Sequence, residues 1–333
     1  MNSVNNFSVD VSVAIMTYFH EDYIEKAVNS VLSQKTKYSY EIVITDDCSE
    51  DKTRDILLRL QEKYPNVIRI FLNDSNLGIS LNSFFNHCQC RGRYIAYLEG
   101  DDYWIDNEKI EKQVSFMDKH PNFFSTVTPI QIRVDDSNQP KMIIPQKRKW
   151  NKTITLKQYL KGEIVSTHGL MMRNIYNTPE GREYFSLVPE LSKYIDDATE
   201  CVLLLQKSPT FILDFESVAY RIHSKKEGKH NYNSLNTKML NFKKIIELYN
   251  KMFETYNGRL NLYYRYKENV STVVFCAFNR KKKEEFWNIY RSIPSIYKRR
   301  GLFLSSIFYK FVVFLKKIRN RIARFFKKRT NNI

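Results

Sequence analysis

The 333-residue sequence has few residues that form cross-links or interrupt helices and strands: it contains nine glycines, nine prolines and five cysteines. The odd number and scattered positions of the cysteines argue against a disulfide framework and favour a reducing compartment. No G-x-G-x-x-G or G-x-x-x-x-G-K-S/T motif is present, so a glycine-rich cradle for nucleotide phosphates is not expected. No run of about 20 apolar residues suggests a membrane span, and the polar residues 1–10 do not resemble a signal peptide. These absences predict a cytoplasmic chain.

Acidic residues are missing from the end of the chain. Residues 298–333 contain twelve lysines and arginines and no aspartate or glutamate, which leaves +5 of the net charge of +17 for the first 297 residues. Because the excess charge is confined to this tail and no RNA- or DNA-binding motif is visible, a nucleic-acid partner is not expected.

The tail at residues 301–329 has the pattern of an amphipathic helix. On a helical projection its bulky apolar residues gather in an arc of roughly 120° and its basic residues fall outside it; only Val312 and Val313 break the division. A helix with an apolar face, a basic polar face and no acids typically lies in a membrane interface and is attracted to anionic lipid. The alternative is an amphipathic helix packed on the protein's own surface.

The rest of the chain can bury a large core, since 43% of the sequence is hydrophobic and 14% is aromatic. Over the first hundred positions, short apolar runs alternate with apolar residues at helical spacing. Strands are predicted at 11–16, 41–45, 67–71 and 94–98, and helices around 24–32, 56–60 and 81–88. This order predicts an α/β fold with a mostly parallel central sheet, whose loops after the strands gather on one edge.

Polar residues follow all four predicted strands. In strand order, these loops contain Thr17-Tyr18, then Asp46-Asp47, then Asn73-Asp74 with Asn76 and Gly78, and finally Glu99 to Asp102. Each loop by itself could be an ordinary turn or helix cap. Four of them on one edge of a sheet indicate a binding site.

Three carboxylates crowd the end of the fourth strand, at Glu99, Asp101 and Asp102. Carboxylates at such short range repel one another. A hard divalent ion such as Mg²⁺ binds oxygen ligands and keeps other positions for water and phosphates. The alternative is a solvated acidic turn. The crowded carboxylates therefore predict a divalent metal ion. This ion would bind the phosphate groups, which a glycine-rich loop binds in other nucleotide sites.

Seven segments occur in a defined order: Val11–Tyr18, Ala27–Gln34, Glu41–Ser49, Asn76–Gly78, Glu99–Trp104, Ser166–Arg173 and Val218–Ser224. This ordered set, spanning residues 11–225, resembles the inverting glycosyltransferases of family 2, of the kind that builds bacterial surface polysaccharides. The resemblance implies a GT-A fold and transfer of a sugar from a nucleotide-sugar donor to a hydroxyl of a glycan acceptor. It also implies Mg²⁺ or Mn²⁺ as the cofactor.

The resemblance carries roles for single residues. It implies that Asp46 hydrogen-bonds the nucleotide base, that Asp101 binds the metal, and that the nucleotide site also includes Thr17, Tyr18, Asp47, Asn76 and Glu99. Asp102 and Trp104 are expected nearer the acceptor, although Trp104 could equally be a core aromatic residue. Glu99 replaces the more usual aspartate and Ser83 stands where many members have arginine, which puts donor identity in doubt.

Asp196 and Asp197 open a predicted helix and resemble the family's catalytic base position. An inverting transfer needs a carboxylate to take the proton of the acceptor hydroxyl, and we expect Asp197 to be that base. Without the resemblance, both would be interpreted as helix-capping residues. His223 is expected to contact metal or phosphate and Lys225 a phosphate; the alternatives are a buried hydrogen-bonding histidine and a solvated lysine turn.

Later segments predict the remaining architecture. A strand is expected at Phe123–Val134, a basic surface loop at 138–155, a strand returning to the sheet at Ser166–Arg173, and helices from about Ser234. The predicted organisation is a catalytic domain at 8–230, a helical appendage at 231–297 and a basic membrane-surface tail at 298–333.

The predicted function is glycosyl transfer to a lipid-linked glycan acceptor at the inner face of the cell membrane. Two alternatives remain open, a nucleotidyltransferase, which would release pyrophosphate, and a catalytically silent relative that binds nucleotide sugars.

Overall fold

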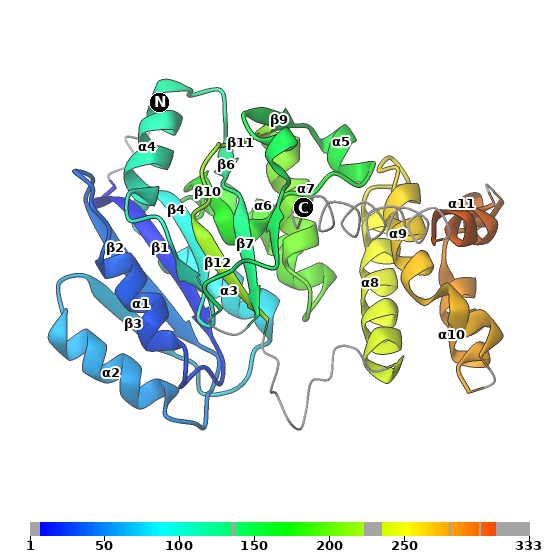
Figure 1. Cartoon of the computed structure of the whole chain (residues 1–333), viewed down its shortest axis with the longest axis horizontal. Coiled ribbons are helices and arrows are strands. Elements are labelled where there is room, and N and C mark those ends of the chain that lie inside the picture. The colour runs from blue at the N-terminus through cyan, green and yellow to red at the C-terminus, as the bar shows by residue number, and fades with distance from the viewer. Residues whose placement is uncertain (1–6, 135–136, 223–234, 280, 300, 311–333) are drawn as a thin grey trace, which may run out of the picture. The chain divides into compact units, whose positions relative to one another are not determined.

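The computed structural model describes residues 7–134, 137–222, 235–279, 281–299 and 301–310 (Figure 1). The chain forms two compact units, residues 1–159 with 163–226, and residues 160–162 with 227–333. The predicted domain boundary at residue 230 falls within 223–234, outside the described residues. In the described part of the chain, no helix has both the length and the apolar content needed to cross a bilayer.

The first unit begins with strictly alternating strands and helices: β1 (Val9–Thr17), α1 (Ile24–Leu32), β2 (Tyr40–Asp46), α2 (Thr53–Lys63), β3 (Ile68–Leu72), α3 (Ile79–Gln89) and β4 (Gly92–Glu99). The four strands are parallel and lie in the order β3-β2-β1-β4, drawn in blue and cyan in Figure 1. The predicted alternation and the predicted parallel sheet are confirmed.

Four further strands extend this sheet beyond β4: β10 (Leu170–Arg173), β6 (Ser125–Val127), β11 (Thr210–Ile212) and β9 (Lys152–Ile154). Strand β10 is antiparallel to both β4 and β6, so the segment at 166–173 returns to the sheet as predicted. A 3₁₀ turn, η2 (Thr167–Gly169), precedes it. The complete sheet is therefore mixed: β1 to β4 are parallel to one another, and β6 and β11 form a second parallel pair.

A second, four-stranded sheet has the order β5 (Tyr103–Trp104), β12 (Val218–Ile222), β7 (Ile130–Val134) and β8 (Met142–Ile144). The single strand predicted at Phe123–Val134 is wrong, because β6 and β7 belong to different sheets. Thr128 and Pro129 separate them: the Thr128 hydroxyl hydrogen-bonds Ser217, and Pro129 has no N–H to continue a ladder. The predicted loop at 138–155 also contains β8, β9 and the 3₁₀ turn η1 (Lys147–Lys149).

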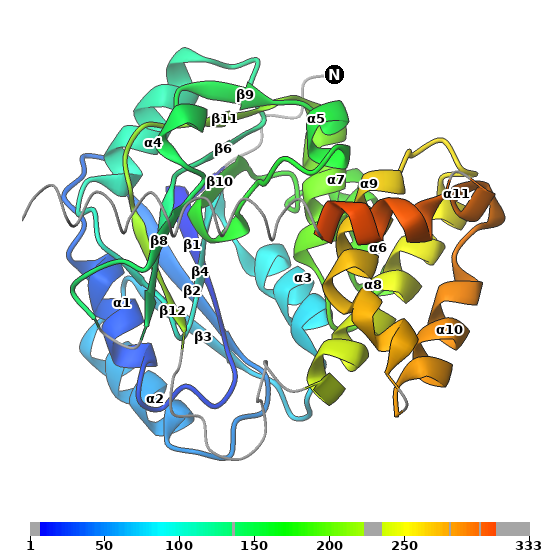
Figure 2. The ribbon, with the colours of Figure 1, turned by 45° about the vertical axis from the view of Figure 1, so that its right-hand side comes forward.

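Helices cover both faces of the main sheet (Figure 2). On one face, α1, α2 and α4 (Lys109–Lys119) bury apolar side chains against Val11, Val13 and Ile15 of β1. Because side chains alternate along a strand, the other face receives α3, and with it α6 (Pro179–Leu191) and α7 (Asp197–Lys207). Asn86 of α3 donates to the backbone of both β1 and β2 on that face. A short helix, α5 (Leu156–Leu160), precedes η2.

The second unit is helical: α8 (Leu235–Thr255), α9 (Tyr263–Val273), η3 (Val274–Phe278), α10 (Lys283–Ser292) and α11 (Ser295–Arg299), followed by helical residues 302–310. Its core is aromatic and includes Phe242, Tyr266 and Phe286. The stacked rings of Phe242 and Phe286 join α8 to α10 with centroids 5.8 Å apart. The predicted helical character of this region is confirmed.

Candidate active site

The loops that were predicted to bind nucleotide and metal share one edge of the sheet. Strands β1, β2 and β4 are parallel and in register, so Thr17 lies beside Asp46 and Met16 lies beside Glu99. The loops are also joined by backbone hydrogen bonds, since the amide of Asp47 donates to the carbonyl of Thr17 at 3.0 Å. Strand β3 is likewise parallel to β2, with Leu72 beside Asp46, and the amide of Asn73 donates to the carbonyl of Asp46 at 3.0 Å. Parallel pairing therefore brings all four predicted loops together at the carboxyl ends of their strands.

Asp46 lies at the bottom of this edge with no exposed surface. Its carboxylate accepts from the backbone N–H and hydroxyl of Ser49 and from Nε of Arg54 at 2.7 Å. The Arg54 guanidinium also donates to the carbonyl of Asn73. Asp46 thus holds the loops after β2 and β3 in place, and its predicted contact with a nucleotide base stays a prediction. Neither Ser49 nor Arg54 was predicted, because each looks like an ordinary polar residue near a helix start.

Asp47 ties the loop after β2 to the loop after β3. Its two carboxylate oxygens accept from the amides of Leu77 at 2.7 Å and Gly78 at 3.0 Å, and the Asn76 side chain donates to its carbonyl. Gly78 has φ of 85°, a left-handed conformation that glycine adopts without strain. The structure therefore brings Asp47 and Asn76 into contact.

An exposed aromatic pair follows β1. The rings of Tyr18 and Phe19 meet edge to face with centroids 4.5 Å apart, and the side chains are 45% and 40% exposed. Beside them, the buried hydroxyl of Thr17 has no hydrogen-bond partner within the described chain. Two open rings next to an unpartnered hydroxyl could hold a planar, polar ligand such as a nucleobase. Phe19 was not predicted, although it follows Tyr18 directly in the loop.

Five carboxylates gather where β4 ends and α7 begins, and we call this group the acidic cluster: Glu99, Asp101, Asp102, Asp196 and Asp197. Burial raises the pKa of Glu99 well above its usual value, and the charges of the other four members raise it further. Such mutual repulsion is relieved by a cation.

The acidic cluster does not form a complete metal cage. Within the part of the chain that the structure describes, no three His, Cys, Asp or Glu side chains are arranged to hold a metal ion. Mg²⁺ is typically held by one or two carboxylates together with substrate phosphates and water. The residues present therefore fit a divalent ion that binds together with a nucleoside diphosphate.

Two histidines flank the acidic cluster. Nε2 of His20 lies 3.8 Å from Oδ2 of Asp101, and Nε2 of His168 lies 3.7 Å from Oδ2 of Asp102. Burial lowers the pKa of His168, and the charges of Asp197 and Asp101 oppose this change. Neither histidine was among the predicted site residues; His20 could have been found from its place in the loop after the first strand.

Asp102 joins the acidic turn to β12. Its side chain is 1% exposed, and Oδ1 accepts from the amide of Arg221 at 2.9 Å. The Arg221 guanidinium in turn donates to the carbonyl of Asp101 at 2.7 Å. Burial and the charge of Asp101 raise the pKa of Asp102 well above its usual value. Asp102 therefore fixes the position of its neighbour Asp101.

The other residues predicted near the acceptor or the phosphates have different placements. Trp104 is 4% exposed and belongs to the hydrophobic core, with Nζ of Lys109 4.9 Å from its ring centroid. This placement fits the core alternative, and its predicted acceptor contact stays a prediction. His223 and Lys225 lie outside the described residues.

The two aspartates at the start of α7 have unlike surroundings. Asp196 is the N-cap, and its Oδ1 accepts from the amide of Asp197 at 2.8 Å. Burial and the charge of Asp197 raise the pKa of Asp196 to about 6, against a hydrogen bond from Ser83 that lowers it. Asp197 is exposed at the first position of the helix. Of the pair, Asp197 is the more exposed carboxylate, and its predicted role as the base stays a prediction.

One turn further along α7, Glu200 is buried next to the acidic cluster. It accepts a hydrogen bond from the Tyr97 hydroxyl, and its Oε1 lies 3.9 Å from Nδ1 of His87. Burial raises the pKa of Glu200 to about 8, and burial lowers the pKa of His87 to about 3. This buried network joins α7, β4 and α3. It was not predicted, because a single glutamate in an apolar helix carries no positional signal.

The family model for "Glycosyl transferase family 2" matches residues 12–177, which include the loops after β1, β2, β3 and β4. The chain belongs to glycosyltransferase family 2. The putative teichuronic acid biosynthesis glycosyltransferase TuaG of Bacillus subtilis is 37% identical over 123 residues, 37% of this chain and 47% of that protein. The UDP-Glc:alpha-D-GlcNAc-diphosphoundecaprenol beta-1,3-glucosyltransferase WfaP of Escherichia coli is 38% identical over 117 residues, 34% of this chain and 44% of that protein.

The family 2 chain spans about half the length of the curated relatives it matches. Among solved structures, S. aureus TarS in complex with UDP-GlcNAc superposes with a TM-score of 0.57 at 18% identity, covering 86% of this chain and 82% of TarS. At that identity the likeness concerns the fold, and it confirms the predicted GT-A architecture.

Proposed function

We propose that this family 2 protein transfers a sugar, with inversion, from a nucleotide-sugar donor to a hydroxyl of a glycan acceptor during surface polysaccharide synthesis. The observation that carries the proposal is the acidic cluster, which lies on the same sheet edge as the loops around Asp46 and Tyr18. Teichuronic acid biosynthesis by TuaG and glucosyl transfer by WfaP support the substrate class.

The nucleotide would lie across the ends of β1 and β2. Tyr18 and Phe19 offer open rings for the base, and the loops joined by Asp47 frame its sugar and phosphates. Asp101, with 26% of its side chain exposed and Glu99 nearby, would hold Mg²⁺ or Mn²⁺. When bound, the ion would neutralise the charge that builds on the departing nucleoside diphosphate.

Asp197 would act as the general base. Asp197 is exposed and belongs to the acidic cluster. The neighbouring Asp196 carboxylate already accepts a hydrogen bond as the cap of α7. A carboxylate in that position can take the proton of the acceptor hydroxyl as its oxygen attacks the sugar. Asp102 and Arg221 would keep the acidic turn in place during the transfer.

The acceptor is proposed to be a lipid-linked glycan at the inner surface of the cell membrane. The name of WfaP specifies a diphosphoundecaprenol-linked acceptor for that relative. In this chain, Leu304, Ile307 and Phe308 form an exposed apolar stripe on the helix at 302–310. Residues 311–333, which contain eight lysines and arginines, lie outside the described residues. The exposed stripe supports our proposal of a cytoplasmic protein that is peripheral on the membrane.

Calorimetry with UDP tests the metal and nucleotide assignment. Wild-type protein is expected to bind UDP much more tightly with Mn²⁺ than with EDTA, and Asp101→Asn is expected to lose that difference. Asp55→Asn, an exposed aspartate in the first turn of α2, is the matched control and should keep it. Unchanged metal-dependent binding in Asp101→Asn would remove the basis of the assignment.

Turnover with a panel of nucleotide sugars tests the reaction class. Release of a nucleoside diphosphate from one donor is the expected result. Release of pyrophosphate would instead identify a nucleotidyltransferase, and binding without turnover of any donor would identify a silent relative.

A further inference from the structure

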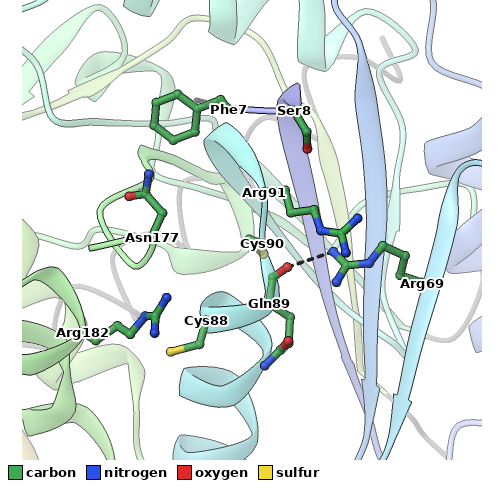
Figure 3. A pocket seen from close by; sticks show the side chains of 9 residues that line it. All are labelled: Phe7, Ser8, Arg69, Cys88, Gln89, Cys90, Arg91, Asn177 and Arg182. Atoms are coloured by element: carbon green, nitrogen blue, oxygen red, sulfur yellow. Dashed lines mark hydrogen bonds between the residues drawn. The ribbon is translucent and has the colours of Figure 1, made fainter. Parts of the chain in front are cut away.

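Three arginines line a pocket at the opposite end of the sheet from the acidic cluster. The pocket has a volume of about 410 Å³, and its lining includes Arg69, Arg91, Arg182 and the two thiols Cys88 and Cys90 (Figure 3). It lies where β4 begins and α3 ends, whereas the acidic cluster lies where β4 ends. The nine residues of β1 separate the two ends by roughly 25 Å at the rise of a strand.

The guanidinium groups come from different walls. Figure 3 shows Arg69 and Arg91 on the strand side of the pocket and Arg182 on the side of α6. The fold holds two of them in place. Nη1 of Arg69 donates to Glu41 and to the carbonyl of Gln89, both at 2.9 Å. Nε of Arg182 donates to the carbonyl of Tyr176 at 2.6 Å.

The positive charge of this pocket is not balanced by nearby acids. None of the described lining residues is acidic. Glu41, which pairs with Arg69, is 6% exposed, and both of its carboxylate oxygens accept hydrogen bonds. One accepts from Arg69, and the other accepts from the Ser12 hydroxyl and the backbone N–H of Arg91. For the guanidinium of Arg91, no partner is found among the described residues.

The thiols cannot supply the missing negative charge. Burial raises the pKa of Cys88 to about 11, against the opposing charge of Arg182. Burial also raises the pKa of Cys90 well above its usual value. Both thiols are therefore neutral at physiological pH. Arg69 closes the end of α3 by binding the Gln89 carbonyl, which leaves Arg91 and Arg182 as the cations available to a ligand.

We propose that this pocket binds a phosphate group, attracted by the guanidinium groups of Arg91 and Arg182, which line its opposite walls. A guanidinium presents a planar fork of donors that matches phosphate oxygens. A tetrahedral phosphate directs its oxygens toward several walls at once, whereas a carboxylate offers two oxygens in one plane. The site is separate from the nucleotide edge, and it stands whether or not the proposed transfer is correct.

Binding measurements on the full-length protein in EDTA test this site, because EDTA suppresses metal-dependent binding at the acidic cluster. Isothermal titration with inorganic phosphate is expected to show saturable, salt-sensitive binding that UDP does not displace. The double variant Arg91→Gln/Arg182→Gln should bind at least about tenfold more weakly, since two charge-assisted contacts are lost. Arg59→Gln, an exposed arginine on α2, should bind like the wild type.

A second binding experiment distinguishes two kinds of phosphate ligand, a lipid headgroup and a free or terminal phosphate. Dihexanoyl phosphatidylglycerol, used as a soluble monomer, presents a phosphodiester headgroup, whereas inorganic phosphate represents a free or terminal phosphate. Weaker binding of either probe by the double variant, with an unchanged melting temperature and unchanged donor turnover, supports the site. Equal binding by the double variant and the wild type, or no saturable binding of either probe, overturns it.

Discussion

At the scale of single residues, Asp196 and Asp197 show how two adjacent carboxylates acquire different roles. Asp196 closes the first turn of α7 by accepting from the next amide, and burial raises its pKa to about 6. Asp197 is exposed at the first position of the helix, next to this cap. Position along the helix, rather than residue type, therefore determines which of the two carboxylates caps α7 and which is exposed.

Replacing Asp197 by asparagine should separate catalysis from binding. We expect Asp197→Asn to keep UDP affinity and to lower turnover by at least about a hundredfold, the range typical of losing a general base. Initial rates and calorimetry on the same preparation measure the two quantities. A collapse of UDP affinity would instead place Asp197 in the nucleotide or metal site.

Asp196→Asn is the matched comparison, because asparagine is as good an N-cap as aspartate. Because asparagine keeps the cap and removes a carboxyl group whose pKa burial raises to about 6, Asp196→Asn should not lower the melting temperature at neutral pH. Asp196→Ala loses the cap, which is worth about 1 kcal/mol, so it should be less stable than Asp196→Asn. If Asp196→Asn loses turnover and Asp197→Asn does not, the roles of the two residues are exchanged.

At the scale of secondary structure elements, the buried network of Tyr97, Glu200 and His87 joins the helix that carries the proposed base to the sheet and to α3. Burial raises the pKa of Glu200 to about 8, far above the value of a glutamate in an unfolded chain. Between those two pKa values the folded protein keeps a proton that the unfolded chain releases. Glu200 therefore makes the protein less stable as pH rises through this window.

Glu200→Gln should remove that pH dependence, because glutamine accepts the Tyr97 hydrogen bond without titrating. Relative to the wild type, the variant is expected to gain stability between pH 5 and pH 8, by at most about 1.4 kcal/mol for each pH unit. Chemical denaturation at several pH values measures the gain. The exposed Glu183→Gln on α6 is the control and should follow the wild type; a constant offset for Glu200→Gln would contradict the argument.

Strands and helices with a clear local pattern of apolar residues were predictable from the sequence. Strands that depend on pairing or hydrogen bonds with residues far away in the sequence were not. The four parallel strands follow from apolar runs and helical spacing, and their order explains why the polar loops meet. Strands β6 and β7 were predicted as one strand because the break at Thr128 depends on Ser217, far away in sequence. The short strands β8 and β9 likewise exist only through pairing with β7 and β11.

The same distinction applies to the candidate site. Carboxylates in loops after strands were visible in the sequence, including Glu99 and Asp101. The partners that position them were not: Arg54 reaches Asp46 from α2, and Arg221 reaches the acidic turn from β12. Such contacts depend on tertiary packing, which no local pattern records.

At the scale of the whole molecule, the basic charge and the apolar stripe meet near the end of the chain. Leu302 and Ser306 are buried within the helical unit, and Phe303 packs against Trp287 with centroids 4.9 Å apart. Leu304 and Phe308 on the same helix are 72% and 68% exposed. Residues 302–306 therefore belong to the folded unit, and a cut for testing the tail should follow Lys310, not precede the packed turn.

Protein truncated after Lys310 should remain folded and turn over donor as before, but lose binding to anionic vesicles. The cut removes eight lysines and arginines from residues 311–333, each worth about 1 kcal/mol near an anionic surface. We expect sedimentation with phosphatidylglycerol-containing vesicles at moderate salt to fall at least about tenfold. In the full chain, Phe308→Ser should weaken sedimentation, and Leu240→Ser, an exposed position on α8, should not. Equal sedimentation of truncated and full-length protein would exclude the tail as the anchor, and unfolding on truncation would favour a helix packed on the protein's own surface.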